Sequence, residues 1–221
     1  MLKMVLVPIH REGRIFVVLF AAVTIILWWI TPHLGGVGLV VTLWCIYFFR
    51  DPTRVTPRRP GIVVAPADGV VLPIRNLAPP AEVAETEEPR ECVAIFMNVF
   101  DVHVNRVPAD GTVDAVDYRP GKFFNASLDK ASVDNERTAV RMTTGAGHGL
   151  VFVQIAGLVA RRIVNGLEAG QAVVRGDRFG IIRFGSRVDV YLDPAYEPLV
   201  LEGQRTVAGE TVIARLKSEA R

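Results

Sequence analysis

Two long apolar segments near the N-terminus constrain this chain more than any other feature. Ile15 to Ile30 is almost continuously apolar, Thr31-Pro32-His33 interrupts it, and a second apolar run continues to Phe49. Each run is about 16 residues, or roughly 24 Å as a helix, slightly short of the ~30 Å hydrocarbon core of a bilayer. The pattern predicts a helical hairpin that spans or dips into a membrane. A buried hairpin in a soluble core is the alternative.

The distribution of charge and aromatic residues favours the membrane. Residues 1–59 contain seven Lys and Arg against two acidic residues, a net charge of +5, whereas residues 60–221 carry −3. The turn at Pro32 has no Lys or Arg beside it, and Trp28-Trp29 and Tyr47-Phe48-Phe49 have the composition of interfacial aromatics. These features predict the cell membrane as the location, with both ends of the hairpin and the following domain on the cytoplasmic face.

The composition of the chain changes after the hairpin. Residues 51–60 include three prolines and three arginines and predict a linker, because proline resists helix formation. From Gly61 onward, short apolar runs alternate with Pro, Gly and Asp, which is typical of β-strands and turns. We therefore predict a mainly β (α+β) fold with three parts: a hairpin at 1–50, a linker at 51–60 and a compact β domain at 61–221.

A weak internal repeat lies near the C-terminus. Gly170-Gln171 is followed by Gly176-Asp177, and Gly203-Gln204 is followed by Gly209-Glu210 at the same spacing. Such turns between short strands resemble the hairpins of barrel-sandwich hybrid domains. The repeat also raises a non-enzymatic alternative, a membrane-tethered carrier or binding module of that type.

The sequence lacks the motifs of several kinds of site. Cys45 lies inside an apolar run, so a bridge to Cys92 is disfavoured and a reducing compartment fits. We find no His, Cys, Asp and Glu set with metal-ligand spacing, no glycine-rich phosphate loop and no basic-aromatic stripe. We therefore expect neither a metal nor a nucleic-acid partner.

One short segment, Arg183-Phe184-Gly185-Ser186-Arg187, lies between two runs that predict strands. On local grounds alone, Gly185-Ser186 is a hairpin turn. Its flanking arginines either hold a carboxylate or phosphate or are simply solvated strand positions, and the second interpretation is favoured.

Phe184-Gly185-Ser186 acquires a different meaning beside several other segments of the chain. With the N-terminal hairpin they resemble, in order and spacing, the short membrane-associated bacterial and archaeal form of the phosphatidylserine decarboxylases. The segments that carry this resemblance are Phe48-Phe49-Arg50-Asp51-Pro52-Thr53-Arg54, Ala65-Pro66-Ala67-Asp68-Gly69, Asp101-Val102-His103, Pro120-Gly121-Lys122-Phe123 and Asn135-Glu136-Arg137.

The resemblance implies a self-processing carboxy-lyase. Ser186 would attack the Gly185 carbonyl, and cleavage would give a β chain, 1–185, and an α chain, 186–221, which remain together as a heterodimer. Ser186 would become a covalent pyruvoyl group, the only cofactor, which binds phosphatidylserine as a Schiff base and releases CO2 and phosphatidylethanolamine. Glycine suits the cleavage site because it has no Cβ to obstruct the hydroxyl.

The resemblance also implies roles for other side chains. His103 matches a motif histidine and would act as a general acid or base in decarboxylation, and Asp68 or His103 would assist maturation. The long-form enzymes have a second histidine three residues later, but this chain has Arg106 there, so their Asp-His-Ser relay cannot be copied intact. Head-group contacts or ordinary ion-paired positions are expected at Asn135, Arg137, Arg161 and Arg162.

A third possibility is a pyruvoyl-dependent decarboxylase of a soluble amino acid. The apolar hairpin favours a lipid substrate over this alternative, because a lipid head group must be met at the membrane surface.

Overall fold

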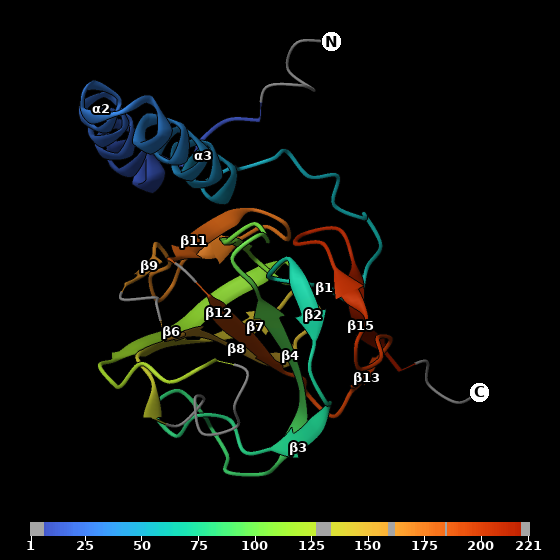
Figure 1. Cartoon of the computed structure of the whole chain (residues 1–221). Coiled ribbons are helices and arrows are strands. Elements are labelled where there is room, and N and C mark those ends of the chain that lie inside the picture. The colour runs from blue at the N-terminus through green and yellow to red at the C-terminus, as the bar shows by residue number, and fades with distance from the viewer. Residues whose placement is uncertain (1–6, 127–133, 159–161, 184, 218–221) are drawn as a thin grey trace. The chain divides into compact units, whose positions relative to one another are not determined.

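The computed structural model describes residues 7–126, 134–158, 162–183 and 185–217. The chain separates into two compact units, Met1–Thr53 and Arg54–Arg221, whose elements are labelled in Figure 1. Each unit is described by itself.

The first unit is an antiparallel helical hairpin. A 3-10 turn, η1 (Arg11–Gly13), leads into α2 (Arg14–Ile30) and α3 (Pro32–Phe48). The break between the helices follows from Thr31-Pro32: the Thr31 hydroxyl accepts a hydrogen bond from the Leu34 amide at 3.3 Å, and proline occupies the first helical position. Thr24 and Thr42 join the helices through their hydroxyls at 2.9 Å.

The outer surface of this hairpin is strongly apolar. The segment Arg11–Ile30 has a mean hydropathy of 2.2 over its most apolar window, and only 6% of that window is buried. Trp29 is 88% exposed. Among the described residues, Arg11–Ile30 is the one helical segment long and apolar enough to cross a membrane, and Pro32–Phe48 is shorter. The hairpin predicted from the sequence is confirmed, and its apolar surface suits association with lipid.

The second unit is built of antiparallel strands. A nine-stranded sheet runs in the order β10-β6-β7-β8-β12-β4-β2-β14, with β3 also paired to β4. Two three-stranded sheets, β1-β15-β13 and β5-β11-β9, complete the unit. The strands are β1 (Ile62–Val64), β2 (Gly69–Val71), β3 (Arg75–Leu77), β4 (Arg90–Met97), β5 (Val104–Arg106), β6 (Gly111–Arg119), β7 (Arg137–Thr144), β8 (Gly149–Ala156), β9 (Ile163–Asn165), β10 (Ala172–Val173), β11 (Arg178–Ile182), β12 (Ser186–Tyr191), β13 (Tyr196–Pro198), β14 (Arg205–Thr206) and β15 (Val212–Leu216).

The C-terminal repeat closes the edges of the large sheet. The glycines of both copies have φ between +75° and +87°, a conformation that glycine adopts readily. The first copy flanks β10 and the second flanks β14, the two edge strands of the sheet. A Cβ built on Gly209 would lie 3.5 Å from the Gly176 Cα, so turns from opposite edges meet. The large sheet is therefore curled into a half-barrel, and the predicted mainly β (α+β) class is confirmed.

Strand β12 lies in the middle of this sheet and is buried on both faces. Val188 and Val190 belong to the main core, whereas Tyr191 belongs to a second cluster that Val83 covers from the loop before β4. Since side chains alternate along a strand, Ser186 shares the face of Val188 and Val190. Ser186 thus lies at the start of a central strand that is buried on both faces.

Candidate active site

The segment around Gly185-Ser186 is not a hairpin turn. Strand β11 ends at Ile182 and belongs to a three-stranded sheet, whereas β12 begins at Ser186 in the nine-stranded sheet. The hairpin-turn interpretation was wrong because the local sequence does not reveal that the two flanking strands belong to different sheets. Phe184 lies outside the described residues. Gly185 has φ +64°, so the chain passes between sheets through a left-handed residue that favours glycine.

Ser186 is fully buried on the core side of β12. It pairs with Met97 of β4 and Ala156 of β8, and its hydroxyl lies 3.8 Å from the Met97 sulfur. These neighbours are largely apolar, so the hydroxyl is screened from bulk water. A serine in such a place is well positioned but still requires a proton acceptor to act as a nucleophile.

His103 supplies a candidate acceptor beside the same backbone. Its fully buried ring has Nδ1 3.0 Å from the Asp101 carbonyl oxygen, and Nε2 lies 3.3 Å from the Gly185 amide nitrogen. A carbonyl can only accept and an amide N–H can only donate, so the partners assign the proton to Nδ1 and the lone pair to Nε2. Asp101 is held in turn by an ion pair with Arg205.

The Gly185 carbonyl is positioned by a residue that the sequence did not single out. Gly157 follows the last residue of β8, and a Cβ built on it would lie 2.0 Å from the Gly185 oxygen. The carbonyl that Ser186 would have to attack therefore rests directly against the Gly157 backbone. This contact fixes the direction of the carbonyl relative to β12.

We predict that Gly157→Ala slows or prevents cleavage of the chain by at least about tenfold, because the Gly185 carbonyl must move away to admit a methyl group. The fraction of cleaved chain over time, measured by gel electrophoresis, tests this. Gly149→Ala is the matched control: it changes the first residue of the same strand, where a Cβ would meet only an Arg90 nitrogen at 3.8 Å. Wild-type cleavage kinetics in Gly157→Ala would show that the contact has no positioning role.

A second group missed from the sequence is a chain of side-chain amides beside Met97, of which Asn105 and Gln154 are fully buried. Gln154 donates to the Asn105 oxygen at 2.8 Å and accepts from Asn165 at 2.9 Å, and Asn105 donates to the Met97 sulfur at 3.7 Å. Gln154 interrupts the otherwise apolar run Leu150–Ala156, which was the available signal. With Met97, the network joins four strands close to Ser186, β4, β5, β8 and β9, and limits their movement.

Asp68 is half-buried near Asp101 but has different partners. Its carboxylate accepts two hydrogen bonds from Arg54, at 2.7 and 2.9 Å, and one from the Ala208 amide at 2.8 Å. Burial raises its pKa above the ordinary value, and the Ala208 amide and Arg54 oppose that effect. Among the described residues its hydrogen-bond partners are Arg54 and Ala208, so the structure does not bring Asp68 into contact with Ser186 or His103.

The expected head-group residues separate into different places. Asn135 is buried and donates to the Ala156 carbonyl at 2.7 Å, beside the Ser186 pair. Arg137 binds Glu82 at 2.7 Å, and its register with Ile155 places it on the opposite face of the sheet from Ser186. Arg162 is exposed just before β9, and Arg161 lies outside the described residues.

Arg187 and Arg106 are both buried. For Arg187 this contradicts the expectation of a solvated strand position. Arg187 is 3% exposed and forms a bidentate pair with Asp189, with nitrogen–oxygen distances of 2.5 and 2.9 Å. The expectation of a solvated Arg187 was wrong because the loop before β4 covers that face. Arg106, which replaces the second motif histidine, donates to the Gly176 carbonyl at 2.7 Å and so holds a turn.

The described residues contain no group of three or more His, Cys, Asp and Glu side chains that could hold a metal ion. The candidate site brings together a buried serine, a glycine carbonyl and a histidine.

The family match and the similar proteins agree on one family. Residues 41–214 match the family described as phosphatidylserine decarboxylase. The chain is 56% identical to a phosphatidylserine decarboxylase proenzyme of Cereibacter sphaeroides, over 100% of this chain and 96% of the relative. It is 56% identical to one of Paramagnetospirillum magneticum, over 96% and 88% of the two chains. It is 54% identical to one of Ruegeria pomeroyi, over 95% and 96%.

Proposed function

Because the chain belongs to the phosphatidylserine decarboxylase family and is a carboxy-lyase, we propose that it matures by cleaving its own Gly185–Ser186 bond and then decarboxylates phosphatidylserine. The observation that carries this proposal is the arrangement around that bond. Gly185 has a left-handed backbone conformation, its carbonyl lies against Gly157, and its amide donates to His103. Ser186 is fixed at the start of a central strand.

The proposed cleavage uses only groups of this chain and one water molecule. The Ser186 oxygen attacks the Gly185 carbonyl carbon, the C–N bond breaks, and the serine amine takes up the proton, leaving an ester. Loss of the Ser186 Cα proton then expels Gly185 as a carboxylate and leaves dehydroalanine. Hydrolysis of its imine tautomer releases ammonia and leaves a pyruvoyl group. The products are the β chain, 1–185, and the α chain, 186–221, which together form one enzyme.

The structure supports this position for a pyruvoyl group. Residue 186 is paired on both sides by β4 and β8, so the new N-terminus would remain seated in the sheet after cleavage. Its surroundings on the core side are apolar, which protects a reactive carbonyl from water. When formed, the group supplies the carbonyl that accepts the electron pair left by departing CO2.

The protein side chains would orient the reaction and move its protons. We assign His103 the proton transfers, because its Nε2 lone pair is directed at the reactive backbone and a histidine ring can exchange protons near neutral pH. We assign Asp68 a supporting role through Arg54 and the Ala208 amide, since its contacts lead away from the hydroxyl. Asn135 would hold the end of β8 in place, and Arg162 is available to a head group at the surface.

A lipid substrate agrees better with the first unit than a free amino acid does. The hairpin exposes a large apolar surface that suits a bilayer. We propose that residues 1–50 attach the enzyme to the cell membrane and that residues 61–221 carry out catalysis on the cytoplasmic face, as the flanking arginines indicate.

Intact-mass analysis of the purified protein tests the proposed maturation. We expect two chains divided after Gly185, and a keto group at the α-chain N-terminus that borohydride reduces with loss of activity. Activity on phosphatidylserine, and little on free serine, is the expected substrate result. An active, uncleaved chain would refute the maturation, and equal activity on free serine would refute the lipid assignment.

A further inference from the structure

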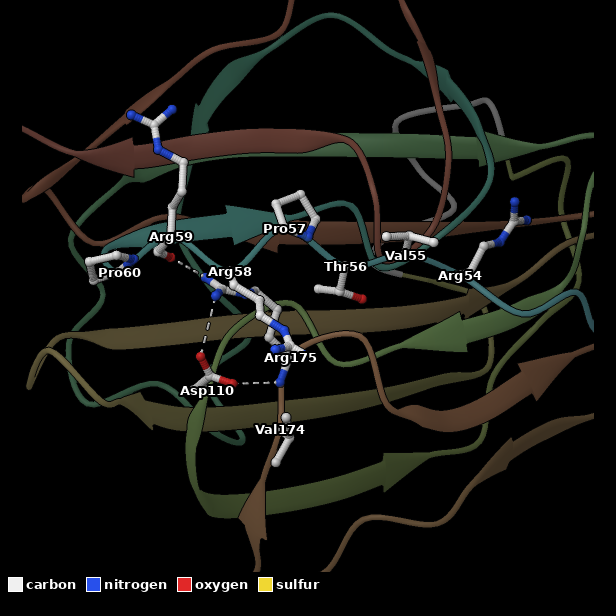
Figure 2. A pocket seen from close by; sticks show the side chains of 10 residues that line it. All are labelled: Arg54, Val55, Thr56, Pro57, Arg58, Arg59, Pro60, Asp110, Val174 and Arg175. Atoms are coloured by element: carbon white, nitrogen blue, oxygen red, sulfur yellow. Dashed lines mark hydrogen bonds and ion pairs between the residues drawn. The ribbon is translucent and has the colours of Figure 1, made fainter.

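A separate pocket on the second unit is lined by arginines. Its volume is about 680 Å³, and its walls come from residues 54–60, Asp110, and Val174 and Arg175 of the turn after β10. Figure 2 draws the lining side chains, four of which are the arginines Arg54, Arg58, Arg59 and Arg175, with Asp110 as the one carboxylate; in this view the Arg54 and Arg59 guanidinium groups point away from Asp110. A pocket of this size can accept a small ligand or a lipid head group. Its lining contains none of Gly185, Ser186 and His103, so it is distinct from the proposed catalytic site.

The charges of the pocket are only partly balanced. Arg54 is paired with Asp68 at 2.7 Å, and Arg175 with Asp110 at 3.5 Å. Arg58 and Arg59 are exposed, and among the described residues neither guanidinium has an ion-pair partner. The two remaining positive charges favour an anionic ligand, and planar guanidinium groups bind phosphate oxygens well.

Buried donors in the wall point to the same class of ligand. The Arg175 side chain is only 9% exposed, and its Nε has no hydrogen-bond acceptor among the described residues. The Nε of Arg54 is also buried without a hydrogen-bond acceptor among the described residues. Buried donors are normally satisfied, and both Nε atoms are closed to solvent, so either arginine would have to turn toward the pocket before an oxygen of a bound anion could serve as its acceptor.

The wall is held in place rather than loosely attached. Arg175 donates to the Arg59 carbonyl at 2.8 Å and to the Ile62 carbonyl at 3.1 Å, and the first of these contacts is visible in Figure 2. The Val55 amide donates to Glu210 at 2.9 Å. Residues 54–60, which the sequence predicted to be a linker, thus form one side of an ordered pocket.

We propose that this pocket binds the phosphate group of an anionic glycerophospholipid outside the catalytic site. The phosphate class follows from the four arginines that line the pocket against a single carboxylate. The lipid source follows from the sequence, since Arg54 comes only six residues after the last residue of the apolar helix α3. Such a site would hold the β domain to an anionic membrane through charge, in addition to the apolar hairpin.

Titration of the full-length, matured protein in neutral detergent tests the proposal. Short-chain phosphatidylglycerol is the probe, bound lipid is counted by native mass spectrometry, and phosphatidylcholine of the same chain length is the zwitterionic comparison. In Arg58→Gln/Arg59→Gln, we expect the half-saturating concentration of phosphatidylglycerol to rise about tenfold, because two charged donors are lost. Phosphatidylcholine should bind more weakly to the wild type and respond little to the substitution.

Arg75→Gln/Arg119→Gln is the matched control, since it removes the same charge from two exposed arginines outside the pocket and should shift binding less than about twofold. Inorganic phosphate is the second arm: competition at concentrations equal to those of phosphatidylglycerol would assign the pocket to soluble phosphate and refute the lipid source. Unchanged phosphatidylglycerol binding in Arg58→Gln/Arg59→Gln would refute the site itself. Chain cleavage is measured on the same samples, so failure of this proposal is distinguishable from failure of the proposed maturation.

Discussion

Replacing Ser186 with alanine is expected to leave the 221-residue chain whole and without decarboxylase activity. Alanine removes the only atom that can form the ester with Gly185 and changes little else, because the side chain lies in an apolar environment beside Met97 and Ala156. In the proposed mechanism Ser186 is both the nucleophile and the source of the electron-accepting group, so its loss removes the whole catalytic route. Gel electrophoresis gives the cleavage result, and release of CO2 from phosphatidylserine gives the activity.

Thr143→Ala is a suitable control for this substitution. It removes a hydroxyl from β7 of the same sheet, where the side chain is exposed and hydrogen-bonded to Asp114 at 2.9 Å, so normal cleavage and activity are expected. Comparable thermal unfolding of the two variants would show that both are folded. Cleavage of Ser186→Ala after residue 185 would overturn the assignment of the reactive bond.

The sequence predicted the fold class well because the main determinants are local. Continuous apolar runs interrupted by Thr31-Pro32 specify a helical hairpin, and short apolar runs separated by turn residues specify strands. The repeated glycine spacing marked turns that the structure confirms at both edges of the large sheet. These features need no knowledge of which strands pair.

The errors and omissions concern contacts between distant segments. Gly185-Ser186 resembled a hairpin turn because pairing of β12 with β4 and β8, rather than with β11, has no local signature. Arg187 appeared solvated because the loop that covers it is about a hundred residues earlier in the chain. Gly157 is a common residue type, and its importance is revealed only by the Gly185 oxygen, which lies 2.0 Å from the point where a Cβ on residue 157 would stand.

Substituting His103 is expected to separate proton transfer from positioning. In His103→Gln, the side-chain oxygen can still accept the Gly185 amide hydrogen bond that Nε2 accepts at 3.3 Å, but an amide cannot exchange a proton at neutral pH. We therefore expect the chain to be cleaved, although more slowly, and decarboxylation to fall by about 10²- to 10⁴-fold. Cleavage is followed by gel electrophoresis and turnover by release of CO2.

His103→Ala complements this variant because it removes both the hydrogen bond and the proton carrier. We expect less cleavage than in His103→Gln, and partial recovery of turnover in its cleaved fraction when imidazole is added, since the truncated side chain leaves space for that ring beside Gly185. A residue with a purely structural role would show no such recovery. Full turnover by His103→Gln would exclude His103 from proton transfer and move the search for the acid to another group near Ser186.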